Sequence, residues 1–138
     1  MPSVYALFAF FGQSELGYHL AVPEGRWAED LASEYLRGLG YLIVARNWRW
    51  RGGEVDIVAK DGATLVFVEV KGRRQKEYGT PEEAVDLRKR RHLWRAALAF
   101  LGEKVDRVPV RFDVLAVGPE GIRHIKHAFG GEDVRQGG

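Results

Sequence analysis

Apolar residues between positions 25 and 39 recur at intervals of three and four, so that Trp27, Leu31 and Leu36 fall on one side of a helix. An acidic side chain near the start of this segment, Glu29, lies at the positive end of the helix dipole. The pattern predicts a first helix over Gly25–Leu39, with one apolar face that packs on a sheet.

Three strands are expected next. Tyr41–Trp50 forms the first strand, and Glu54–Lys60 and Ala63–Arg73 form a β-hairpin. The segment Asp61-Gly62 is the expected two-residue loop of this hairpin, because both residue types tolerate a positive φ.

A second helix is expected to open at Thr80-Pro81-Glu82-Glu83, whose hydroxyl, proline and glutamate fit a capping box, and to end at Gly102. The last two strands are Val108–Val117 and Ile122–Lys126. The order α-β-β-β-α-β-β predicts an α/β (α+β) fold, in which helices flank a central sheet.

The length of 138 residues suits one domain. We expect an N-terminal extension of unknown role over residues 1–24, which contain no Lys or Arg, then a domain over 25–129 and a flexible tail over 130–138. No apolar run approaches the roughly 18 residues of a membrane span, so no membrane association is expected. The chain has no cysteine, which excludes disulfides and thiolate chemistry, and the cytoplasm is the expected location.

The charge pattern favours a polyanionic partner. The chain carries 21 Lys and Arg against 19 Asp and Glu, and many of its bases are clustered beside aromatic residues. The run Arg88–Arg91 is expected to form a solvated helix face, with DNA contact as the alternative. Trp48 and Trp50 are expected to pack in the core, with stacking on bases as the alternative. The candidate phosphate contacts are Arg46, Arg49, Arg51, Arg73, Arg74 and Lys89.

The expected hairpin brings acids together. Its two-residue loop implies the cross-strand pairs Lys60–Ala63, Asp56–Phe67 and Glu54–Glu69. Because side chains alternate between faces, four charged residues then share one face: Glu54, Asp56, Glu69 and Lys71. Like charges so placed are costly, and a shared Mg²⁺ or Mn²⁺ offsets that cost. The alternative is a surface ion-pair cluster, and Glu54 in particular is expected to pair with an arginine.

Asp56 and the triplet Glu69-Val70-Lys71 resemble the D…E-x-K core of restriction-endonuclease-like nucleases. The surrounding sequence, GRWAEDLASEYLRGLGYLIVARNWRWRGGEVDIVAKDGATLVFVEVKGRR, YGTPEEAV, RKRRHLWRAALAFL and VRFDVLAV, closely resembles the YraN-type family of small uncharacterised bacterial proteins. That family has a fold similar to that of archaeal Holliday-junction resolvases. The resemblance extends from about Gly25 to Phe129 and implies a restriction-endonuclease-like mixed sheet.

The resemblance also implies roles for residues. Asp56 and Glu69 hold Mg²⁺ or Mn²⁺ with the Val70 carbonyl, Lys71 assists the attacking water, and Glu29 binds the metal directly or through water. The alternative for Glu29 is a simple helix-terminal charge. The implied activity is a metal-dependent endonuclease that cuts branched or structured DNA as a homodimer. The alternatives are a non-catalytic nucleic-acid-binding module and a protein-interaction domain that uses the apolar N-terminal arm.

Overall fold

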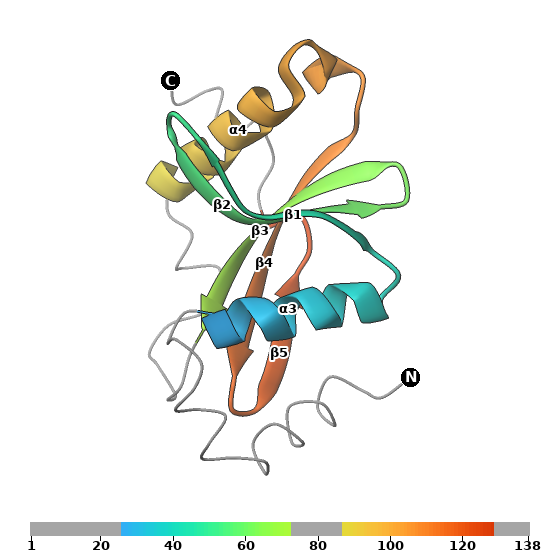
Figure 1. Cartoon of the computed structure of the whole chain (residues 1–138), viewed down its shortest axis with the longest axis vertical. Helices are drawn as coiled ribbons and strands as arrows, with labels where there is room; N and C mark the ends of the chain where they lie inside the picture. The colour runs from blue at the N-terminus through green and yellow to red at the C-terminus, as the bar shows by residue number, and fades with distance from the viewer. Residues whose placement is uncertain (1–25, 73–86, 129–138) are drawn as a thin grey trace.

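A computed structural model describes residues 26–72 and 87–128 of the chain, which fold into one sheet and its helices (Figure 1). The elements in chain order are α3 (Arg26–Gly38), β1 (Leu42–Trp50), β2 (Gly53–Asp61), β3 (Thr64–Gly72), α4 (Leu87–Leu101), the 3₁₀ helix η1 (Gly102–Asp106), β4 (Val110–Gly118) and β5 (Gly121–Ile125). This order confirms the predicted α-β-β-β-α-β-β fold. The expected extension, tail and capping box lie outside the described residues. Within those residues, no helix is long and apolar enough to cross a membrane.

The sheet is mixed, with its five strands in the order β1-β2-β3-β4-β5. β3 and β4 are parallel, and the other neighbours are antiparallel. Parallel neighbours need a long crossover connection, and here it contains α4 and η1. The central position of β3 agrees with the apolar sequence LVFV, which is buried throughout.

The two helices cover opposite faces of the sheet. Along β3, Leu65 and Phe67 pack in an apolar cluster with residues of α4, whereas Val66 and Val68 pack in a second cluster with residues of α3. This alternation is the period-two pattern of a strand that is buried on both faces. The sheet is therefore the middle layer of the described part of the chain.

The register of the β2–β3 hairpin differs from the prediction. Asp61 pairs with Thr64 and Lys60 with Leu65, so Gly62-Ala63 forms the turn, and Val58 rather than Asp56 lies opposite Phe67. Gly62 adopts the positive φ of +61°. Asp61 is drawn into the ladder because Arg111 of β4 binds its carboxylate at 2.8 Å. A shift of two keeps each side chain on its face, and continuing this register puts Asp56 level with Glu69.

The alternation of faces breaks in both β1 and β2 at the level of Asn47 and Asp56, and β1 breaks it once more at a bulge between Ile43 and Ala45. Arg46 reaches the acids of α3, whereas Trp48 packs in the α4 cluster, because Asn47 between them has a φ of +50°. On β2, Val55 packs in the α4 cluster and Ile57 in the α3 cluster. Asp56 therefore lies where the strand changes faces, between the two layers of helix.

Candidate functional site

Two acids meet at this break, Asp56 of β2 and Glu69 of β3, and Glu29 of α3 lies nearby. The Asp56 carboxylate accepts a hydrogen bond of 2.8 Å from the Val70 backbone N–H. Both Glu29 and Glu69 act electrostatically on Asp56, and Glu69 also shares a side-chain hydrogen bond with it. The Glu69 side chain is only 13% exposed, so water does little to screen the pair.

Asp56 is the acid whose titration the site changes most. Burial, followed by the charge of Glu69, raises its pKa from 3.8 to about 7. Glu29 raises the pKa further, whereas the Val70 N–H opposes the rise. Two carboxylates in this arrangement keep a proton near neutral pH unless a cation takes its place.

Two lysines already supply positive charge to this pair. Lys71 Nζ lies 3.5 Å from Glu69 Oε1, and Lys89, in the first turn of α4, donates a hydrogen bond to the same oxygen. Burial, followed by the hydrogen bond to Lys89, lowers the pKa of Lys71. Burial also acts to lower the pKa of Lys89, but its bonds to Glu69 and Lys71 outweigh this and raise it.

Two glycines let the helices come close enough to the sheet to complete the site. A Cβ on Gly72 of β3 would lie 2.8 Å from the Cβ of Ala28, so the first turn of α3 rests on the end of β3. A Cβ on Gly53 of β2 would collide with a ring carbon of His92, which approaches from α4 and bonds the Glu54 carbonyl oxygen. These approaches bring Glu29 and Lys89 toward the acids of β2 and β3.

Glu54 does not join the other acids, so the predicted common face is wrong for this residue. It pairs with Arg49 at 3.3 Å near the β1–β2 turn, which confirms the expected arginine partner. The cause is the face change at Asp56, because a regular alternation would have kept Glu54 and Asp56 on one side. The core of the site is therefore two acids with a third nearby.

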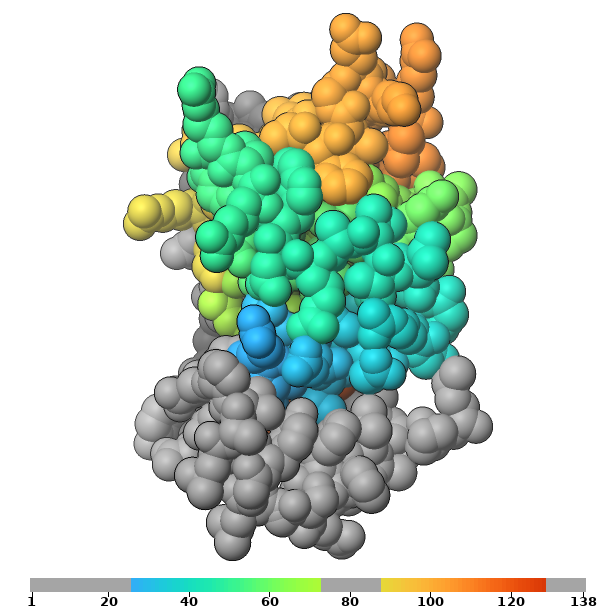
Figure 2. All heavy atoms as spheres, viewed as in Figure 1, coloured from blue at the N-terminus to red at the C-terminus, as the bar shows by residue number. Residues whose placement is uncertain are grey.

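The candidate phosphate contacts differ in their surroundings. Arg46 binds Asp30 at 2.6 Å and lies 4.0 Å from Glu29, so α3 and β1 are tied together where they adjoin in Figure 2. Arg49 and Arg51 are exposed. Lys89 is committed to Glu69, and the remaining candidates, Arg73 and Arg74, lie outside the described residues.

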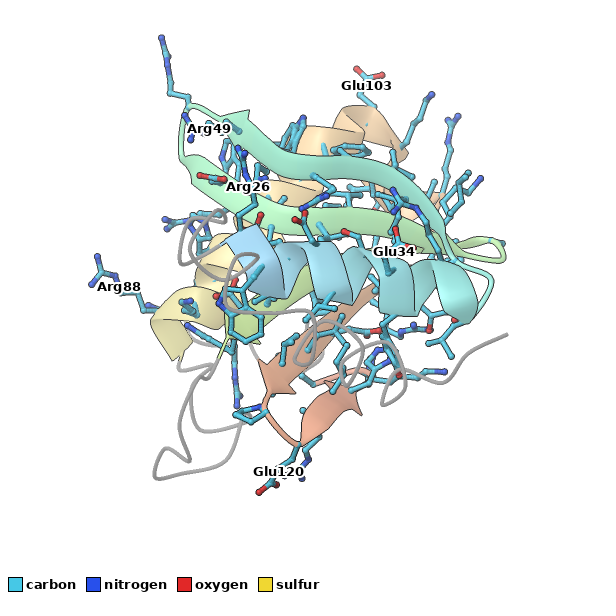
Figure 3. The ribbon with its side chains drawn as sticks, turned by 60° about the horizontal axis from the view of Figure 1, so that its bottom comes forward. Arg26, Glu34, Arg49, Arg88, Glu103 and Glu120 are labelled. Atoms are coloured by element: carbon cyan, nitrogen blue, oxygen red, sulfur yellow. The ribbon has the colours of Figure 1, made fainter. Side chains whose placement is uncertain are left out.

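Exposed arginines surround the acids. Figures 1 and 3 both place the start of α3, the start of α4 and the β1–β2 turn on the same side of the molecule. Arg26, Arg49 and Arg88 belong to these three places, and each is exposed (Figure 3). The site therefore combines an acidic centre with a basic rim.

The two tryptophans of β1 pack against the core, as expected. Trp48 and Trp50 stack with ring centroids 5.4 Å apart and pack in the α4 cluster. Trp48 also meets Phe100 edge-on, and Trp50 lies against His92.

A separate buried network lies at β4. Asp113 is fully buried and accepts two hydrogen bonds of 2.9 Å from Arg111. His124 Nε2 lies 2.8 Å from the same carboxylate, and the ring's Nδ1 lies 3.0 Å from the Tyr35 hydroxyl. Burial acts to raise the pKa of Asp113, but the bonds from His124 and Arg111 outweigh it and lower the pKa. Every carboxylate oxygen is satisfied, so this network is structural.

Comparisons with known proteins agree with one another. Residues 28–117 match the uncharacterised protein family UPF0102. A UPF0102 protein of Geobacter sulfurreducens is 55% identical over 108 residues, which cover 73% of this chain and 84% of that protein. One from Symbiobacterium thermophilum is 50% identical over 76% of this chain and 94% of its own length. One from Rhodococcus opacus is 46% identical over 83% of this chain and its own entire length.

Proposed function

We propose the function of this chain from its own site. The chain belongs to the uncharacterised protein family UPF0102, whose description names no reaction. The function is a metal-dependent endonuclease that hydrolyses phosphodiester bonds of branched or structured DNA. The observation that carries it is the Asp56–Glu69 pair, in which burial and mutual repulsion raise the pKa of one carboxylate to about 7. A chain that maintains so costly a pair has a use for a cation there.

The residues fit Mg²⁺ or Mn²⁺. Among residues 26–72 and 87–128, no three His, Cys, Asp or Glu side chains are close enough to form a metal cage. Mg²⁺ does not need one, because it keeps several waters and binds proteins through one or two carboxylates. Asp56 and Glu69 would supply these, with Glu29 acting through water. The Val70 carbonyl is a further donor, because a strand residue directs its N–H and C=O toward the same neighbour, and the Val70 N–H already bonds Asp56.

Each residue then has a role in hydrolysis. A bound divalent ion lowers the pKa of a water and offsets negative charge on the phosphate. Lys71, 3.5 Å from Glu69, would orient the attacking water or stabilise the charge that develops on the phosphoryl oxygens. The water oxygen would form the new bond to phosphorus and give up a proton to solvent, the P–O ester bond would break, and the leaving oxygen would take a proton from solvent.

The basic rim supports a nucleic-acid substrate. Arg26, Arg49 and Arg88 are exposed on the side of the molecule where α3 and α4 begin, and arginines so placed can contact a phosphate backbone. The preference for branched DNA and the homodimer come from the resemblance to junction resolvases, since symmetric cleavage of two strands needs two sites.

The test is cleavage of labelled four-way junction, flap, single-stranded and duplex DNA with Mg²⁺ or Mn²⁺. We expect cleavage by the wild type and its loss in Asp56→Asn and Lys71→Met. The matched control is Lys60→Met, which removes an exposed positive charge from the same hairpin. Junction binding without any cleavage would favour the non-catalytic nucleic-acid-binding module. Cleavage that survives both substitutions would rule out this site.

A further inference from the structure

Lys89 lies where it competes directly with a cation for Glu69. Its ammonium group bonds Glu69 Oε1, and Lys71 Nζ lies 3.5 Å from that same oxygen. The Glu69 side chain is only 13% exposed, so few directions of approach remain open to it. The proposed function requires this same carboxylate for a divalent ion.

We propose that Lys89 is the counter-ion of Glu69 in the metal-free chain and that a divalent ion must displace it. This inference rests on the metal site of the proposed function. An ammonium group and a divalent cation on one carboxylate oxygen repel each other strongly in a poorly screened site. One of the two lysines therefore has to leave when the metal binds.

Lys89 is the lysine that moves. Lys71 belongs to β3, whose backbone pairs with β4 from Leu65 to Gly72, and its side chain is 31% exposed. Lys89 is in the first turn of α4, and its side chain is more exposed, at 39%. Its ammonium group can therefore rotate from Glu69 toward solvent when the metal binds.

Calorimetric titration of MnCl₂ into the full chain tests the displacement without reference to cleavage. We compare the wild type with Lys89→Met and with Arg95→Met, which removes the same charge from an exposed position on the same helix. Because a hydrogen bond to a charged group contributes about 1.5–3 kcal/mol, removing this competitor should tighten Mn²⁺ binding by about tenfold or more. Arg95→Met should change it by less than about twofold, since an exposed charge at a distance is screened.

A second variant and a second measurement keep the test decisive if Lys89→Met folds poorly. Lys89→Gln keeps a hydrogen-bond donor without the charge, and it should bind Mn²⁺ with an affinity between those of the wild type and Lys89→Met. Without metal, Lys89→Met should melt below the wild type, and saturating Mn²⁺ should raise its Tm by more. A Mn²⁺ affinity in Lys89→Met no tighter than in Arg95→Met overturns the inference.

Failure of this inference differs from failure of the proposed function. Tighter Mn²⁺ binding in Lys89→Met with no cleavage of any DNA supports the displacement and rejects the endonuclease. Metal-dependent cleavage by the wild type with an unchanged affinity in Lys89→Met rejects the displacement and leaves the endonuclease standing. Absence of Mn²⁺ binding in all these proteins rejects both.

Discussion

The variant Asp56→Asn measures how much free energy of unfolding the chain loses by holding the Asp56 and Glu69 carboxylates together. Asparagine keeps the shape of aspartate and an oxygen that can accept the Val70 N–H bond of 2.8 Å, but it has no charge. In the folded chain, burial and then Glu69 raise the pKa of Asp56 from 3.8 to about 7. The unfolded chain thus releases this proton near pH 4, whereas the folded chain retains it until about pH 7.

The wild type should therefore lose stability as the pH rises from about 4 to about 7, and the lost stability should not return above pH 7. One pKa unit corresponds to about 1.4 kcal/mol, so a rise of about three units amounts to as much as about 4 kcal/mol. Asparagine has no such proton to release. The free energy of unfolding of Asp56→Asn, minus that of the wild type, should increase by up to this amount across the interval.

The assay is urea unfolding in EDTA at several pH values across this interval. The difference between the two proteins is the quantity to follow, because the lowered pKa values of Asp61 and Asp113 destabilise both of them at low pH. A difference that stays flat with pH would refute the reasoning, since it would mean that Asp56 ionises in the folded chain as easily as in the unfolded one.

Three further predictions concern the core, the packing of α3 and the basic rim. Asp113→Ala should lower the free energy of unfolding by about 3–5 kcal/mol in urea titrations, because it leaves Arg111 without the buried carboxylate that it now bonds twice. Gly72→Ala should destabilise by about 1–3 kcal/mol in the same assay, because its Cβ would lie 2.8 Å from that of Ala28. Arg49→Ala should reduce the slope of log affinity against log salt for DNA by about one, measured by fluorescence anisotropy.

Matched controls make these results specific. Glu120→Ala, in the exposed turn after β4, should stay within about 0.5 kcal/mol of the wild type. A cost that small for Asp113→Ala would mean that the network at β4 contributes little to stability. Wild-type stability in Gly72→Ala would mean that α3 does not rest on the end of β3, and an unchanged salt slope in Arg49→Ala would remove this arginine from the DNA interface.

The sequence predicted the elements well because each carries its own periodicity. The α3 segment buries Trp27, Leu31 and Leu36, as its spacing of three and four required, and LVFV is buried on both faces as an interior strand. These patterns depend on local backbone geometry alone. For the same reason the sequence could place Asp56 and Glu69 on neighbouring strands.

Features set by distant parts of the chain could not be predicted in this way. The hairpin register depends on Arg111, which is 50 residues from Asp61 and binds it from β4. Asn47 has a positive φ, which changes the face of the sheet toward which the following β1 side chains point. No glycine stands at this position to signal the change in the sequence. Lys89 looked like one base in a solvated run, and only the packing of α4 on the sheet directs it to Glu69.

The parallel pairing of β3 with β4 has a consequence for synthesis of the protein on the ribosome. β3 is complete at Gly72, but its partner begins at Val110, so its apolar edge emerges long before β4 can cover it. At about 5–20 residues per second, the 37 residues between these positions take roughly 2 to 7 seconds to make. During that interval the nascent chain presents an open, hydrophobic strand edge, the kind of surface that chaperones protect from aggregation.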